Sequence, residues 1–191
     1  MALDKIYIDS CGFIDAVKTD VGEITEPDRA NDIWYIKACL KAAKNGDLEV
    51  FTSHLTIAEC RRAGGAPSEK VKRLFNSILV SGKVVRLADL TLGIAERARD
   101  LEWIHGINLG GADAIHIATA LTLGCKEFFT FDKKKGKSPI GRKVEIAKLG
   151  LRVITPSETF YLPDSYKQLE IEYPEGETTN ALVEHLENRN E

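Results

Sequence analysis

Short apolar runs alternate along the chain with longer segments of helical periodicity. The runs predict buried strands at residues 5–8 (KIYI), 48–52 (LEVFT), 127–131 (EFFTF) and 151–154 (LRVI), while 83–87 (KVVRL) fits a strand or a connector. Apolar positions three and four residues apart predict the helices between them. Alternating strands and helices are typical of a parallel sheet with helices on both faces, so the sequence predicts an α/β fold.

Start and stop residues bound the expected helices. The spacing predicts helices after the first strand to about residue 16, over 29–44, over 54–62 with Ser53 as its cap, from Pro67 to about residue 80, over 91–104, and from Gly111 to the stop at Gly124. Residues 19–28 are expected to form a loop. In the 91–104 helix, Leu92 and Trp103 are expected on or near the apolar face.

Four acidic residues stand at the joints of this pattern. Asp9 and Asp132 directly follow strands, Asp113 lies in the first turn of a helix, and Glu59 lies about a turn and a half into another. Strand carboxyl ends and the following helix starts share one edge of a parallel sheet, where ligands bind. Each residue alone fits an ordinary turn or helix position. Together they predict a cluster of carboxylates at that edge.

Converging carboxylates repel one another unless a cation lies among them. An all-oxygen set favours Mg²⁺ or Mn²⁺ over zinc. Such a cluster suits phosphodiester hydrolysis, in which one metal lowers the pKa of an attacking water and a second stabilises the leaving oxygen.

Four segments carry a resemblance to a known family: IYIDSCGFIDAV (6–17), TSHLTIAEC (52–60), GGADAIHIATAL (110–121) and FFTFDKK (128–134). In order and spacing they resemble the PIN-domain family over about residues 3–155. The resemblance implies a three-layer α/β/α sandwich with a central parallel sheet. It also implies a Mg²⁺- or Mn²⁺-dependent endoribonuclease, often the toxin of a toxin–antitoxin pair, so RNA, an antitoxin protein and a second copy in a homodimer are the expected partners. Asp9, Glu59, Asp113 and Asp132 match the family's acidic positions, and Ser10 matches the small hydroxyl residue after the first acid.

One departure from the family pattern leaves an alternative open. Many members place a further acid shortly after the last Asp, where this chain has Lys133, Lys134 and Lys135. A non-catalytic PIN scaffold that binds RNA or a protein partner is therefore the main alternative. A flap-endonuclease-type DNA nuclease and a phosphatase with Asp9 as nucleophile are weaker ones.

Basic residues flank two of the acids. Arg61 follows Glu59, and Lys133 and Lys134 follow Asp132, so these three, with Ser10, are the candidate substrate contacts through RNA phosphates. His116 is expected to be a histidine at the edge of the core with a satisfied hydrogen bond. The four cysteines are expected to be buried thiols.

The 191 residues have a formal charge of −3, which conceals two unequal parts. From Pro156 onward nine acidic residues face two basic ones, a charge of −7, whereas residues 1–155 carry +4. We therefore expect a nuclease-like domain over 1–155 and an acidic C-terminal extension over 156–191. The absence of an apolar run of about 20 residues argues against a membrane span. The N-terminus does not resemble a signal peptide, and the cysteines show no zinc or disulfide spacing, so a cytoplasmic protein is expected.

Overall fold

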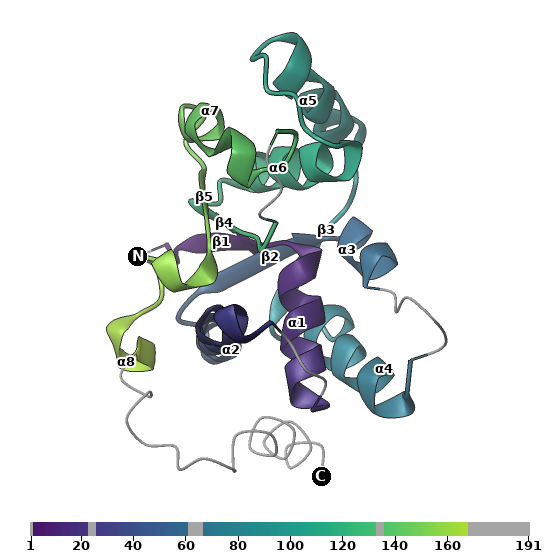
Figure 1. Ribbon diagram of the computed structural model, residues 1–191, viewed down its shortest axis with the longest axis vertical. Helices are drawn as coiled ribbons and strands as arrows, with labels where there is room; N and C mark the ends of the chain where they lie inside the picture. Colours follow the sequence, from purple (N-terminus) through teal and green to yellow (C-terminus); the bar gives the residue numbers. More distant parts are fainter. Residues whose placement is uncertain (1, 23–25, 61–66, 133–135, 168–191) are drawn as a thin grey trace.

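The computed structural model describes residues 2–22, 26–60, 67–132 and 136–167. Five strands form one parallel sheet in the order β3 (Val85–Ala88), β2 (Glu49–Ser53), β1 (Lys5–Ile8), β4 (Glu127–Phe129) and β5 (Arg152–Ile154) (Figure 1). The predicted α/β fold with a central parallel sheet is confirmed, and the ambiguous segment around residue 85 is a strand.

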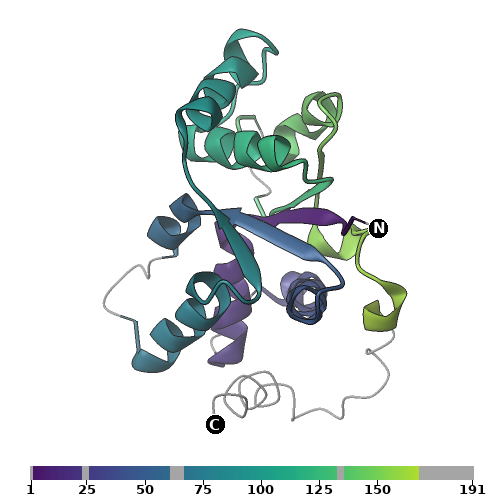
Figure 2. The ribbon, with the colours of Figure 1, turned by 180° about the vertical axis from the view of Figure 1, so that it is seen from behind.

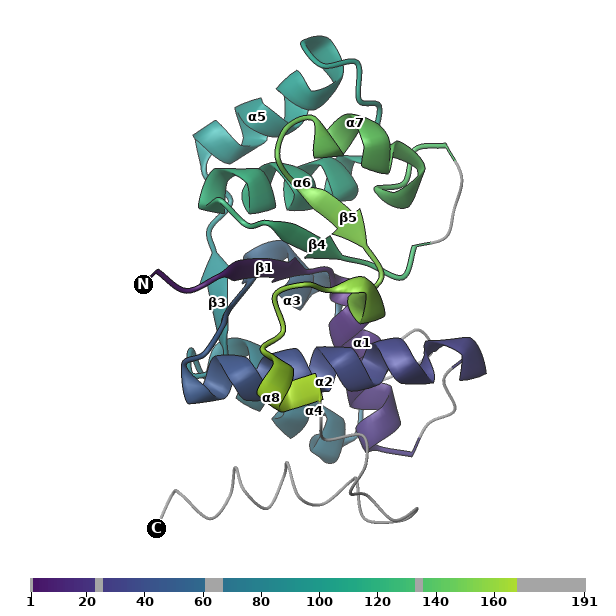
Figure 3. The ribbon, with the colours of Figure 1, turned by 90° about the vertical axis from the view of Figure 1, so that its left-hand side faces the viewer.

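Helices cover both faces of the sheet. They are α1 (Ser10–Asp20), α2 (Ala30–Asn45), α3 (His54–Glu59), α4 (Glu69–Phe75), α5 (Leu92–Trp103), α6 (Gly111–Leu123), α7 (Lys143–Ala147) and α8 (Asp164–Lys167). Figure 3 shows α5, α6 and α7 on one side, and α1, α2, α4 and α8 on the other. From behind, the β3 edge is in view with α4 below it (Figure 2). The described residues thus form the three-layer sandwich that the resemblance implied.

The alternation of side chains along the strands separates the two cores. Ile6 and Ile8 pack on one face with Phe13 of α1 and Ile36 of α2. Tyr7, between them, points to the opposite face, where the ring of Phe128 stacks on it with 5.3 Å between centroids. Successive strand residues alternate between faces. A fully buried tyrosine therefore lies beneath α6.

Several helix boundaries differ from the prediction. Helix α1 continues to Asp20, because Val17 remains on its buried side. Helix α3 ends at Glu59, and Ser68, whose side chain accepts from the Val71 amide, caps α4, so Pro67 does not open a helix. The described chain then continues from α4 into a π-helical turn, Asn76–Val80. Gly124 ends α6 in the left-handed conformation, as predicted.

The prediction that Leu92 and Trp103 lie on the apolar face of α5 is wrong. Leu92 and Trp103 are 76% and 74% exposed, whereas Ile94 and Leu101 are buried. Ile94 and Leu101 are seven residues apart and share one side of the helix. Leu92 and Trp103 each lie two residues from this pair, which at 100° per residue places them on the opposite side.

The first part of the predicted acidic extension packs against the sheet and α2. Leu162 and Tyr166 are buried in the core beside α2. The buried carboxylate of Glu127 on β4 accepts hydrogen bonds from the Thr159 hydroxyl (2.6 Å) and the Phe160 amide (3.1 Å). The boundary at residue 155 stays a prediction, and residues 168–191 lie outside the described residues. No described helix is long and apolar enough to cross a membrane.

Candidate metal centre

The sheet places Asp9 where its strand order reverses. The chain adds β2 and β3 on one side of β1, and later β4 and β5 on the other. Loops leaving the carboxyl ends of β1 and β4 therefore diverge, and such a switch point is the usual ligand site of an open parallel sheet. Asp9 directly follows β1 and donates its amide to Phe129 of β4 (3.0 Å). The prediction that Asp132 directly follows a strand is wrong, because β4 ends at Phe129, three residues before it.

Short contacts fix the orientation of the Asp9 carboxylate. Asp9 caps α1, and its Oδ1 accepts from the Ser10 amide at 2.7 Å. Its Oδ2 accepts from the Thr130 hydroxyl at 3.0 Å and from the Cys11 thiol at 3.4 Å. Burial raises the pKa of Cys11 well above its ordinary value, so this thiol keeps the proton that it donates. Asp9 is buried and held from both sides of the switch point.

Glu59 reaches the same place from the end of α3. Its Oε2 lies 2.8 Å from Nε2 of His116, a residue of α6 that is 1% exposed. The hydrogen bond from His116 lowers the pKa of Glu59 against the opposing effect of burial, so the carboxylate is ionised. The other ring nitrogen, Nδ1, lies 2.7 Å from the Tyr7 hydroxyl. The expectation that His116 is a core-edge histidine with satisfied hydrogen bonds is confirmed.

Asp113 completes the acidic group from the first turn of α6. Burial, followed by the charges of Asp9 and Asp132, raises its pKa from 3.8 to about 6, and Glu59 adds to the rise. This coupling shows that the four acids share one electrostatic environment. The Asp132 amide also donates to Thr130 Oγ1, whose hydroxyl contacts Asp9. The structure therefore places Asp9 and Glu59 within 4.8 Å of each other, together with His116, and places Asp113 and Asp132 near enough for their charges to interact with this group.

The profile of the PIN-domain family matches residues 6–137. This chain belongs to the PIN-domain family. No curated protein matches the sequence. PIN domains are typically metal-dependent nucleases, and the match spans all four acids.

The donors of this PIN domain fit a divalent cation. One ligand atom from each of Asp9, Glu59 and His116 lies within 4.8 Å of the others. Burial raises the pKa of Asp113, and the neighbouring charges of Asp9, Asp132 and Glu59 raise it further. Carboxylate oxygens are the donors that Mg²⁺ and Mn²⁺ prefer. The assignment of individual acids as ligands stays a prediction.

The candidate substrate contacts lie partly outside the described residues. Ser10 is described, and its hydroxyl lies 3.4 Å from Asp9 Oδ1 and also hydrogen-bonds to Glu59. Arg61, Lys133 and Lys134 lie outside the described residues.

Two further residues of the PIN site, Tyr7 and Thr130, were not singled out from the sequence. Thr130 contacts Asp9, and Tyr7 contacts His116. The available signal was a hydroxyl-bearing side chain inside an otherwise apolar strand run, since a buried hydroxyl needs a hydrogen-bond partner.

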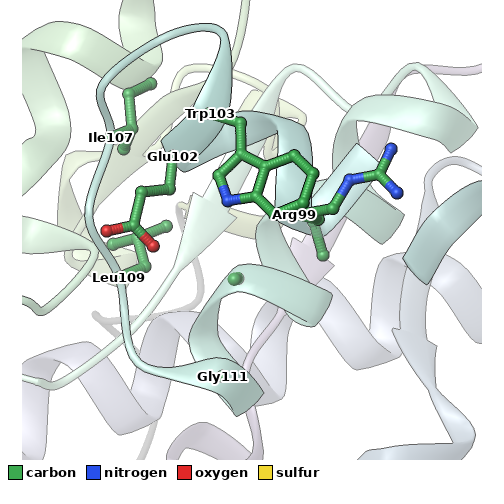
Figure 4. Close-up of a pocket in the computed structure, with 8 residues that line it drawn as sticks. Arg99, Glu102, Trp103, Ile107, Leu109 and Gly111 are labelled. Carbon is green, nitrogen blue, oxygen red and sulfur yellow. The ribbon is translucent and has the colours of Figure 1, made fainter. Parts of the chain in front are cut away.

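A separate hollow lies beside α6, between it and the end of α5 (Figure 4). Its volume is about 220 Å³, and its lining includes Trp103, Glu102 and Leu109. The Arg99 guanidinium lies 4.8 Å from the centre of the Trp103 ring. None of the four acids lines this hollow, although Gly111 and Ala114 on either side of Asp113 do. The candidate metal centre therefore lies next to, and is distinct from, this surface depression.

Proposed function

We propose that this PIN-domain protein is a Mg²⁺- or Mn²⁺-dependent endoribonuclease in which Asp9, Glu59, Asp113 and Asp132 bind the cation. The observation that carries the proposal is the approach of Asp9 and Glu59 to within 4.8 Å at the switch point of the sheet, with Asp113 close enough for the charges of Asp9 and Asp132 to raise its pKa. Carboxylates that lie close together repel one another. This repulsion favours cation binding, because a cation among them offsets their negative charge.

The acids have distinct tasks in this proposal. Asp9, locked by Thr130 and Cys11, provides the fixed ligand, and Asp113 provides the ligand most exposed to repulsion from its neighbours. A bound divalent cation lowers the pKa of a coordinated water and offsets the charge that develops on a phosphodiester. Ser10, placed between Asp9 and Glu59, is suited to bind a phosphate oxygen or the water.

The proposed RNA contacts lie on the loop that follows Asp132. Downstream of them, the carbonyl of the exposed Lys137 accepts from the Gly110 amide at 3.2 Å, which places Lys137 at the start of α6. We propose that Lys133 and Lys134, which follow Asp132 in the sequence, and Arg61, which follows Glu59 two residues later, bind backbone phosphates. Such contacts supply affinity without sequence preference and weaken as salt rises.

The toxin role rests on the resemblance and belongs to the same proposal. The protein would act in the cytoplasm as a homodimer neutralised by an antitoxin, and residues 156–191 would form its acidic extension. Induced expression should arrest growth, and Asp9→Asn should relieve the arrest. Light scattering of the purified protein should give the mass of two chains. Growth unaffected by the wild-type protein would contradict the toxin role and leave the nuclease proposal to be judged on cleavage.

Cleavage and metal binding test the nuclease proposal together. Asp9→Asn and Asp113→Asn should abolish Mn²⁺-dependent cleavage of single-stranded RNA and weaken Mn²⁺ binding by calorimetry, while circular dichroism stays unchanged. Glu96→Gln, which neutralises an exposed acid on α5, is the matched control and should behave as wild type. Mn²⁺-dependent cleavage that persists in both variants would refute the assignment. Cleavage of single-stranded DNA but not RNA would refute the ribonuclease, and failure to bind Mn²⁺ would favour the non-catalytic scaffold.

A further inference from the structure

His116 joins two groups that the fold brings together from distant parts of the chain. Nδ1 lies 2.7 Å from the Tyr7 hydroxyl, and Nε2 lies 2.8 Å from Glu59 Oε2. Tyr7 and His116 are 0% and 1% exposed, whereas the Glu59 side chain is 29% exposed. The fully buried pair of Tyr7 and His116 is thus hydrogen-bonded to a carboxylate that is partly exposed to solvent.

The direction of the hydrogen bond to Glu59 follows from the charge of its acceptor. A carboxylate oxygen accepts hydrogen bonds, and Glu59 Oε2 is the acceptor that faces Nε2. The 2.8 Å contact therefore requires a proton on Nε2. The Tyr7 hydroxyl lies 2.7 Å from Nδ1 and can donate to it. With the Tyr7 hydroxyl as the donor, the ring has Nε2 as its own donor and Nδ1 as its acceptor.

The contact with His116 helps to fix the position of the Glu59 carboxylate. Glu59 is the last residue of α3, a helix of six residues. The backbone amide of the C-cap residue, Cys60, donates to the Thr56 carbonyl and so does not hold the Glu59 side chain. A glutamate side chain loses rotamer entropy when it is held in one conformation, so a hydrogen bond is needed to hold it there. His116 supplies this restraint. It lies in α6, a helix of 13 residues, and its imidazole ring is held by the Tyr7 hydroxyl.

We propose that Tyr7 and His116 form a buried hydrogen-bonded pair that holds the Glu59 carboxylate in the cation site, with His116 donating from Nε2 as a positioning residue and not as a metal ligand. This inference rests on the proposed function for the presence of a cation, but the hydrogen-bond assignment does not. His116 Nε2 lies close enough to Asp9 and Glu59 to share a metal with them. The proton on Nε2 and the preference of Mg²⁺ and Mn²⁺ for oxygen donors distinguish the two roles.

The tautomer is measured first, on the wild-type protein without metal. Long-range ¹H–¹⁵N spectra of the four histidines, with His116 identified by the signals lost in His116→Gln, should show a protonated Nε2 and an unprotonated Nδ1. A proton on Nδ1 with an unprotonated Nε2 would overturn the proposal. This result does not depend on nuclease activity, so it separates failure of the hydrogen-bond assignment from failure of the proposed function.

The metal environment is measured next, with Mn²⁺ as the probe. Electron spin echo envelope modulation of bound Mn²⁺ should show no coupling to an imidazole nitrogen in the wild-type protein. Coupling that disappears in His116→Gln would identify His116 as a ligand and overturn the proposal. A wild-type protein that binds no Mn²⁺ would refute the proposed function and the cation-positioning role together, while the tautomer result would still decide the hydrogen-bond assignment.

Paired variants separate positioning from ligation and from folding. Loss of a group that orients a metal ligand typically weakens metal binding about 10–100-fold, which is the loss expected for His116→Leu in Mn²⁺ titrations. His116→Gln keeps an N–H donor near Glu59 and should restore most of the affinity, at matched melting temperatures. Equal losses in the two variants would contradict the positioning role. Tyr7→Phe should give a smaller loss than His116→Leu, because Ser53 Oγ lies 3.4 Å from Nδ1 and remains as a partner.

Discussion

Gly12 occupies the tightest contact between the helix that carries the Asp9 cap and the rest of the core. It is the third residue of α1, and its amide donates to the Asp9 carbonyl at 3.1 Å. A Cβ added at Gly12 would lie 2.8 Å from Ile8 Cγ2 and 3.0 Å from Ile36 Cδ1. Ile8 and Ile36 are both 0% exposed. The Cδ1 methyl of Ile36 can move, but Cγ2 of Ile8 is attached to Cβ and moves only with its strand.

The magnitudes of two opposing effects decide the outcome of Gly12→Ala. Replacing a helical glycine by alanine gains up to about 1 kcal/mol of helix propensity. Forcing an extra carbon into a packed core costs about 1–3 kcal/mol. Gly93 is the matched control, because it lies in the first turn of α5 and a Cβ there meets no atom within 4 Å. Gly93→Ala should therefore be as stable as wild type or more stable, and Gly12→Ala should be less stable than Gly93→Ala by about 1–3 kcal/mol.

Urea unfolding monitored by circular dichroism measures this difference, with thermal melts as a second readout. The gap corresponds to roughly 2–4 °C per kcal/mol for a chain of this length. Because relief of the clash would move the start of α1, Gly12→Ala should also weaken Mn²⁺ binding, whereas Gly93→Ala should not. A Gly12→Ala protein as stable as Gly93→Ala would refute the argument that contact with Ile8 fixes α1 against β1.

Three further perturbations address other parts of the molecule. Thr91→Ala removes the side chain that accepts from the Ile94 amide at 3.3 Å, so thermal melts should report a loss of about 1 kcal/mol; an unchanged melt would show that this cap is unimportant. Burial raises the folded-state pKa of Glu127 above 4.5, so wild-type stability falls as pH rises through the interval between the unfolded and folded values. The glutamine side chain of Glu127→Gln cannot ionise, so the unfolding free energy of this variant minus that of wild type should increase between pH 4 and pH 7 in urea unfolding. A difference that does not change with pH would contradict the raised pKa of Glu127. Truncation after Lys167 removes seven acidic residues and one basic residue, and should increase RNA affinity at low salt if the extension shields the basic residues; unchanged affinity would exclude shielding.

The strands were predictable because each is a short apolar run between polar or turn residues. The run at 5–8 matches β1 in full, and those at 48–52 and 151–154 match within one residue. Helix ends were less predictable, because local signals compete: Pro67 and Ser68 both mark a helix start, and only the hydrogen bond from Val71 identifies Ser68 as the cap. Exposure of Trp103 depends on which side of α5 packs, which the residues of α5 alone do not determine.

The carboxylates of the site were predictable and their partners were not, for a reason of sequence separation. Acids at strand ends and helix starts can be located from local pattern, because the topology of a parallel sheet gathers those positions. Thr130 contacts Asp9 across 121 residues, and Tyr7 contacts His116 across 109. Such pairings depend on the order of strands, with β1 between β2 and β4, which periodicity does not reveal.

The segment GADAIHIATAL combines two functions of the site on one helix. Asp113 and His116 are three residues apart in α6, so their side chains leave neighbouring positions of its surface. Asp113, in the first turn, remains half-buried at the open edge, while His116, one turn further along, lies over Tyr7 with 5.8 Å between ring centroids. Any shift of α6 along the sheet would move the Asp113 carboxylate together with the His116 ring, which contacts Glu59. Apolar substitutions on the buried side of α6, such as Ile117→Ala, should therefore weaken Mn²⁺ binding more than substitutions of equal stability cost beneath α2.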